Sequence, residues 1–68
     1  MKIEGKDLRF PDNYLDPVTY VPSHVHGNAG HKDCEKGVIV NITDAGVFVL
    51  YCKSRTVQLT DPNDLIWG

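Results

Sequence analysis

The sequence predicts an all-β domain in which a small antiparallel sheet coils into a barrel, and three observations carry this prediction. Apolar residues alternate with a period of two over residues 37–51, on both sides of a turn at 43–46. Two further alternating stretches, at 18–21 and 56–60, are bounded by turn residues. The one helical signal, at 61–65, is long enough only for a single turn. Four to five short strands with tight turns and a terminal one-turn 3-10 helix are therefore expected.

Length and charge narrow the class of protein. The 68 residues make one small domain with nine acidic residues, seven basic residues and a net charge of -2. An acidic chain is poorly suited to bind nucleic-acid phosphates, and so short a chain seldom encloses an active site, so no enzyme is expected. The sequence has no apolar run of about 18 residues and no recognisable secretory leader, which predicts a cytoplasmic protein without a membrane span.

Residues 1–17 form a lead-in segment without a clear hydrophobic period, and Pro11 and Pro17 exclude a long helix there. Two interpretations are open: Phe10 and Leu15 cover one end of the barrel, or about ten residues form a flexible tail. The barrel domain is expected over residues 18–68. Its first strand, at 18–21, ends at Pro22, and the loop that follows over 23–36 is long for so small a domain.

The hairpin at 37–51 has the strongest signal in the chain. Pairing Ile42 with Val47 also pairs Val40 with Val49 and Val38 with Tyr51, and it places all six side chains on one face, the core. Ile39, Phe48 and Leu50 then fall on a second face, which is more apolar than a solvated sheet face. This excess predicts either a strongly coiled sheet or a partner that covers the second face.

The last part of the chain predicts a strand at 56–60, a turn and a closing strand at 65–67. Asp61 suits a helix N-cap, Pro62 suits the first helical position, and Asp64 lies three residues after the cap. These features together indicate one 3-10 turn between the two strands.

Four motifs occur in order along residues 18–65: YVP at 20–22, HKDCEKGV at 31–38, VFVLY at 47–51 and TDPNDL at 60–65. In this order they resemble a group of small uncharacterised proteins encoded by phages and prophages, and more generally SH3-like barrels of the KOW and Tudor types. The resemblance implies an SH3-like barrel, a bacterial host cytoplasm and an accessory role for the phage. It implies no particular activity, since this barrel serves many functions.

Four side chains that can bind metals lie in or beside the loop, namely His24, His26, His31 and Cys34. Imidazole and thiolate groups suit zinc, and four of them complete a tetrahedral site, with Cys52 as a substitute ligand. The spacing is not a standard Cys2His2 pairing, however. The preferred interpretation is a polar loop without a cofactor, and zinc is the alternative.

Cys34 admits two further interpretations. A disulfide with Cys52 is sterically possible in the hairpin register, but it needs an oxidising compartment. A thiol nucleophile beside His31 would also need an oxyanion site and an orienting group, and the sequence locates neither. An unreactive, buried or half-buried thiol is expected instead.

The candidate binding residues are Tyr20, Pro22, Phe48, Leu50 and Trp67. Tyr20, Tyr51 and Trp67, with Pro22 nearby, could line a groove for an extended peptide, although Tyr51 suits the core better and Trp67 suits a lid on the barrel end. Four basic residues could gather at one end of the hairpin, where a solvated rim is the more typical outcome: Lys32, Lys36, Lys53 and Arg55.

Three functions follow from these candidates. A non-catalytic protein-interaction module is expected, which docks on a protein partner or on itself through the second apolar face. A nucleic-acid-binding SH3-like domain is one alternative and needs a continuous basic and aromatic surface. A zinc-stabilised structural or binding domain is the other, and it predicts loss of the fold on chelation.

Overall fold

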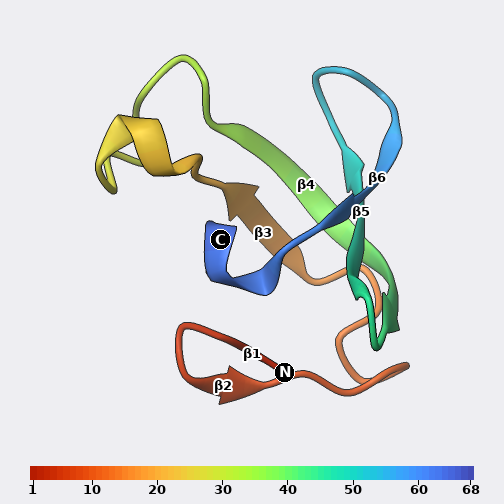
Figure 1. The fold of residues 1–68 in the computed structure, drawn as a ribbon. Helices are drawn as coiled ribbons and strands as arrows, with labels where there is room; N and C mark the ends of the chain where they lie inside the picture. The colour runs from red at the N-terminus through yellow and green to blue at the C-terminus, as the bar shows by residue number, and fades with distance from the viewer.

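The structure, a computed structural model, describes all residues, 1–68, and contains two antiparallel sheets (Figure 1). The larger sheet has five strands in the order β6-β5-β4-β3-β7, and β1 and β2 form a separate hairpin. The strands are β1 (Lys2–Ile3), β2 (Lys6–Asp7), β3 (Pro17–Tyr20), β4 (Glu35–Thr43), β5 (Gly46–Tyr51), β6 (Val57–Thr60) and β7 (Leu65–Trp67). The two 3-10 turns are η1 (Ser23–Val25) and η2 (Pro62–Asp64).

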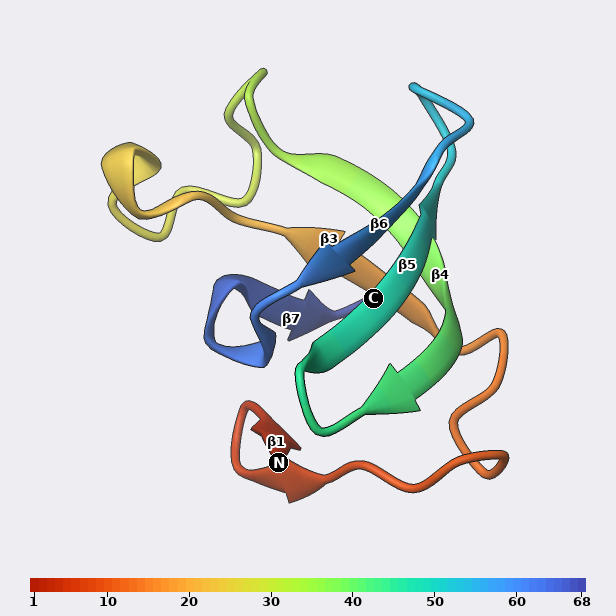
Figure 2. The same cartoon turned by 45° about the vertical axis from the view of Figure 1, so that its right-hand side comes forward.

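The all-β prediction is confirmed, and the sheet remains open. It is strongly curved, with β4 and β5 sweeping around the core in Figure 2, but β6 and β7 are edge strands that do not pair with each other. The predicted closing strand at 65–67 and the 3-10 turn before it are both present, and Asp61 caps η2 by accepting a hydrogen bond from the Asn63 N–H at 2.9 Å. None of the helical segments has the length and hydropathy that a bilayer-spanning helix needs.

A β-bulge in β4 changes the predicted register of the central hairpin. Ile42 pairs with Val47 as predicted, but Ile39 rather than Val40 lies opposite Val49, and Val40 has no partner across the strands. The extra residue moves every earlier position of β4 to the opposite face. Ile39 is consequently fully buried, so its predicted place on the second face is wrong.

The same shift corrects the pairing at the start of the hairpin. Gly37 lies opposite Tyr51, and Val38 lies opposite Leu50 on the outer face, contrary to the predicted pairing of Val38 with Tyr51. A Cβ atom on Gly37 would lie 2.6 Å from the carbonyl oxygen of Leu50 and 2.6 Å from Val49 Cγ1. Glycine at this position therefore allows β4 to cross closely over β5.

The core lies on the concave side of the large sheet and includes a residue from the N-terminal hairpin. Its seven buried side chains are Ile3, Val18, Ile39, Val47, Val49, Tyr51 and Leu65. Leu8, Tyr20, Ile42 and Trp67 are partly buried against this cluster. The predicted core positions of Val47, Val49 and Tyr51 are confirmed, whereas Val38 and Val40 are only half-buried.

The lead-in segment contributes to the core through a residue other than the two predicted ones. Phe10 and Leu15 are both about half exposed, at 51% and 52%, so the prediction that they cover a barrel end is wrong. Ile3 in β1 fills this role and is completely buried. In Figure 1 the β1–β2 hairpin lies beneath the large sheet, near the chain's C-terminal end.

Hydrogen bonds join the N-terminal hairpin to the last strand. The Trp67 backbone N–H donates to Glu4 Oε1 at 2.7 Å, and Trp67 Nε1 donates to the Ile3 carbonyl oxygen at 2.9 Å. The ammonium of Lys6 lies 5.1 Å from the centre of the Trp67 ring, within the range of a cation–π contact. These contacts place the two ends of the chain side by side.

Candidate functional site

A hollow of about 260 Å³ lies beside edge strand β6, between that strand, the end of β3 and η2. Its floor contains two tyrosines, Tyr20 and Tyr51, whose ring centres are 6.3 Å apart in an edge-to-face arrangement. The other lining residues are Glu35, Gln58, Leu59, Thr60, Asp61 and Asp64. Small-molecule sites usually begin at about 300 Å³, so this hollow suits a single side chain better than a cofactor.

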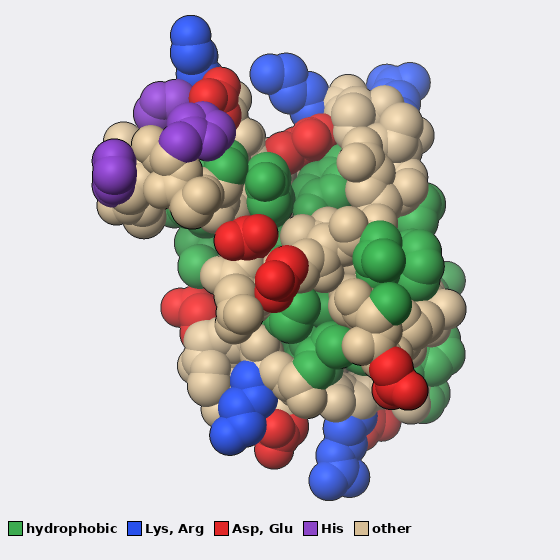
Figure 3. All heavy atoms as spheres, viewed as in Figure 1, with side chains coloured by type: hydrophobic (Ala, Val, Ile, Leu, Met, Phe, Trp, Pro, Cys, Tyr) green, Lys and Arg blue, Asp and Glu red, His purple; other side chains and the backbone are tan.

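Three carboxylates surround the two tyrosines, and none of them pairs with a basic side chain. The ion pairs of the structure are both made by Asp33, which lies outside this hollow. Glu35 accepts one backbone hydrogen bond from Ser54 at 2.7 Å, and Asp61 is occupied by its capping bond. Asp64 makes no side-chain hydrogen bond. In Figure 3 acidic side chains flank an apolar hollow near the middle of the molecule, and Lys and Arg lie around its periphery.

The environment of the hollow also changes the pKa of Tyr51. Burial raises the pKa of the Tyr51 phenol above its ordinary value of 10.0, and electrostatic repulsion from Tyr20, then from Glu35 and Asp64, raises it further. The hydrogen bond between Tyr51 Oη and Thr60 Oγ1, at 2.6 Å, opposes that shift. The unpaired carboxylates that line the hollow favour a cation over an anion beside Tyr51.

The outer face of β5 and β6 carries a continuous apolar surface. Cross-strand pairing places Leu50 beside Val57 and Phe48 beside Leu59 on the side away from the core. Leu50, Val57 and Leu59 are 38%, 53% and 49% exposed, and Phe48 is half-buried. This is the second face predicted from the sequence, extended by two residues of β6. Apolar side chains are visible over these strands at the right of Figure 3.

Edge strand β6 also presents unused backbone groups. The Tyr51 N–H donates to the Thr56 carbonyl, and bonded pairs alternate along an antiparallel ladder. The backbone N–H and C=O groups of Val57 and Leu59 therefore point away from β5, towards the side where no strand follows. An edge of this kind is a template for another extended chain.

The loop after β3 is organised by Asp33. His24 Nε2 lies 2.7 Å from Asp33 Oδ2, and the His31 ring accepts the Asp33 backbone N–H through Nδ1 at 3.0 Å. The rings of His24 and His31 are in edge-to-face contact, with their centres 6.2 Å apart. Pro22 and Val25 are buried, which fixes η1 and the start of this loop.

The structure does not gather the four candidate zinc ligands. No group of three or more His, Cys, Asp or Glu side chains is arranged to hold a metal ion. His26 is exposed at the end of η1, and the Cys34 thiol donates to the Asn28 carbonyl at 3.3 Å. Cys34 and Cys52 are both free, and Cys34 is half-buried while Cys52 is exposed. Zinc binding stays a prediction, to be tested by native mass spectrometry of reduced protein.

Replacing His24 by alanine is expected to raise the pKa of Asp33. The hydrogen bond from His24 is the main cause that holds the pKa of this carboxyl below its ordinary value of 3.8. A lowered pKa contributes stability that is present above pH 3.8 and is lost as the pH falls through the folded-state value, and the solvent exposure of the pair keeps that contribution small. Carbon-13 NMR titration of Asp33 measures the shift. His26→Ala is the control, and an unchanged Asp33 pKa in His24→Ala would contradict the assignment.

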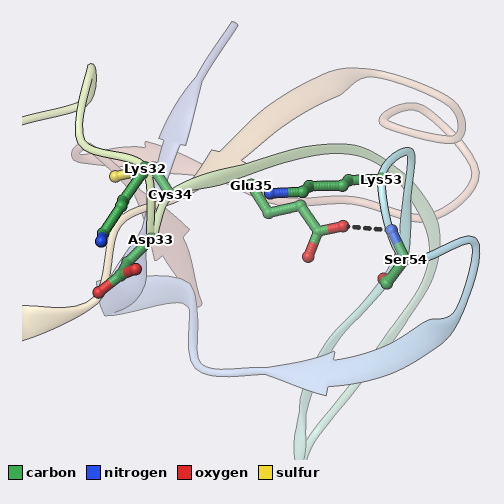
Figure 4. Close-up of a pocket in the computed structure, with 6 residues that line it drawn as sticks. All are labelled: Lys32, Asp33, Cys34, Glu35, Lys53 and Ser54. Atoms are coloured by element: carbon green, nitrogen blue, oxygen red, sulfur yellow. Dashed lines mark hydrogen bonds between the residues drawn. The ribbon is translucent and has the colours of Figure 1, made fainter.

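A second, more open hollow of about 450 Å³ lies between this loop and the β5–β6 turn. Figure 4 shows Lys32, Asp33 and Cys34 on one side of it and Lys53 and Ser54 on the other, with Glu35 between them. Lys53 runs alongside Glu35 without forming an ion pair. Two cations and two carboxylates line this hollow, so it has no dominant charge, and only Lys32 and Lys53 of the four predicted basic residues belong to it.

The candidate binding residues separate into three places. Tyr20 lines the hollow beside β6, Phe48 and Leu50 lie on the outer face, and Trp67 packs against the N-terminal hairpin. Pro22 is buried and offers no surface. Glu35, Asp61 and Asp64 were not predicted as site residues, since only the folded sheet brings positions 35, 61 and 64 beside Tyr20 and Tyr51.

Comparison of the chain with protein-family models, curated proteins and solved structures finds no match.

Proposed function

We propose that the protein is a non-catalytic protein-interaction module that binds an extended segment of a partner protein along β6. One observation carries the proposal: β6 combines outward-pointing backbone groups at Val57 and Leu59 with an apolar outer face continued by Phe48 and Leu50. Addition of a strand to such an edge supplies main-chain hydrogen bonds, and alternate side chains supply the specificity. The open, SH3-like curvature of the sheet is part of the same proposal.

The two sides of β6 define the partner segment. Side chains of an added strand that point outward would extend the apolar surface beside Val57 and Leu59 and are expected to be apolar. Side chains that point inward would enter the hollow lined by Gln58 and Thr60. The partner is therefore an extended segment with apolar residues at every second position.

Selection of random eight-residue peptides against the immobilised protein tests this function. Enriched peptides are expected to carry apolar residues at alternate positions and to slow the hydrogen exchange of the Val57 and Leu59 amides. Failure to enrich such peptides, or protection elsewhere on the protein, would contradict the proposal.

A matched pair of variants separates the backbone contribution from the side chain. Leu59→Pro removes the outward N–H and leaves the bonds to β5, whereas Leu59→Ala removes a similar part of the side chain and keeps that N–H. Peptide binding is expected to fall at least about tenfold further in Leu59→Pro than in Leu59→Ala, the equivalent of one lost hydrogen bond. Equal binding by the two variants would rule out strand addition. Circular dichroism confirms that both variants are folded.

A further inference from the structure

We infer that the hollow beside β6 is a binding site for one cationic side chain, a lysine ammonium or an arginine guanidinium, carried by the partner segment. This inference rests on the proposed function for the segment and adds the chemistry of its central residue. The hollow combines two tyrosine rings with three carboxylates, and no basic side chain of the protein occupies it.

The shape of the hollow sets the size of its ligand. Its volume of about 260 Å³ is bounded on one side by β6 and on the other by Tyr20 and η2. If a partner strand pairs with the free edge of β6, one of its inward-pointing side chains would enter the hollow beside Gln58 and Thr60. A long, unbranched stem can then lie against the tyrosine rings, as lysine and arginine stems do on apolar surfaces.

The charges set the sign of the ligand. Glu35 and Asp64 come from separate elements, β4 and η2, and both line the hollow together with Tyr51. Asp64 has no hydrogen-bond donor in the protein, so its carboxylate is free to accept one from a ligand. The faces of tyrosine rings attract cations. Partial burial of the site strengthens both this cation–π attraction and a hydrogen bond from the cation to a carboxylate, relative to open solvent.

The two other surfaces described above are less suited to select a charged side chain. The four side chains that define the apolar outer face carry no charge that would select one kind of partner residue, and the hollow beside Lys32 and Lys53 has mixed charge. The hollow beside β6 has one sign of charge, two aromatic walls and a free strand edge, and these three features fit the same ligand.

Three acetylated, amidated eight-residue peptides test the inference on the 68-residue protein. Each alternates valine with threonine, and one central threonine is replaced by lysine, by norleucine or by glutamate. Norleucine keeps the lysine stem without its charge. The lysine peptide is expected to bind at least about tenfold more tightly than the norleucine peptide, and the glutamate peptide is expected to bind most weakly. The advantage of lysine should shrink as salt rises from 0.05 to 0.5 M in roughly the manner of a screened ion pair.

Asp64→Asn is the informative variant, because it removes one charge from the hollow and no hydrogen bond from the protein. It is expected to reduce the preference for lysine over norleucine several-fold and to leave the affinity for the norleucine peptide unchanged. Asp44→Asn, in the exposed turn between β4 and β5, changes the net charge equally outside the hollow and is expected to have no effect.

The outcomes distinguish this inference from the proposed function. Equal binding of the lysine and norleucine peptides, both weakened by Leu59→Pro, would overturn the cationic site and leave strand addition intact. Tyrosine NMR shifts with n-butylammonium or n-butylguanidinium but not with n-butanol, without binding of any peptide, would support the cationic site and overturn strand addition. Unchanged lysine preference in Asp64→Asn would also overturn the inference.

Discussion

Replacing Ile39 by alanine is expected to destabilise the protein by about 2–5 kcal/mol, the usual cost of truncating a fully buried isoleucine. Ile39 has no exposed surface and lies opposite Val49 at the centre of the core. At about 0.05–0.15 kcal/mol per residue, a domain of this length has a total stability of about 3–10 kcal/mol. The variant is therefore expected to be close to unfolding at room temperature. Urea denaturation followed by circular dichroism measures the change.

Val40→Ala is the matched control for this prediction, because the β-bulge leaves Val40 half-buried and without a cross-strand partner. Partial exposure limits its cost to roughly 1 kcal/mol. The simple alternation of the sequence predicts the opposite order, with Val40 in the core and Ile39 outside. A larger loss of stability in Val40→Ala than in Ile39→Ala would show that β4 is regular and that the bulge is absent.

The strands of the large sheet and η2 could be predicted from local sequence, whereas the β1–β2 hairpin, η1 and the register of β4 could not. Alternation located β3 to β6 to within a few residues, and the Asp61-Pro62 pair located η2, because capping and strand periodicity are local properties. A single bulged residue at Val40 shifts the faces of β4, and no turn residue marks it. Next to the bulge, the Ile39 N–H donates to the Asp16 carbonyl and the Ile39 carbonyl accepts from the Leu15 N–H, and both partners are far away in sequence.

In the candidate site, too, the local features could be predicted from the sequence and the non-local ones could not. The apolar excess of Phe48 and Leu50 was visible in the hairpin and lies where predicted, on the outer face. The hollow beside β6 was not visible, because Tyr20, Glu35 and Asp64 are brought together only by non-local pairing and by the curvature of the sheet. Residues that act together across 44 positions of sequence, from 20 to 64, leave no spacing signal in a single chain.

Replacing Ile3 by alanine is expected to cost about 2–5 kcal/mol, although Ile3 lies in a lead-in segment without a hydrophobic period. The side chain is completely buried in the main core, and the adjoining backbone and Glu4 accept the two hydrogen bonds donated by Trp67. Losing the side chain should therefore release the β1–β2 hairpin. The backbone amide of Trp67 is then expected to exchange hydrogen faster with solvent, and the fluorescence of the Trp67 indole is expected to shift towards that of an exposed indole. Lys2→Ala, an exposed neighbour in the same strand, should change the stability by less than about 0.5 kcal/mol. Equal urea midpoints for Ile3→Ala and the unmodified protein would mean that the hairpin is a tail and that the core is complete without it.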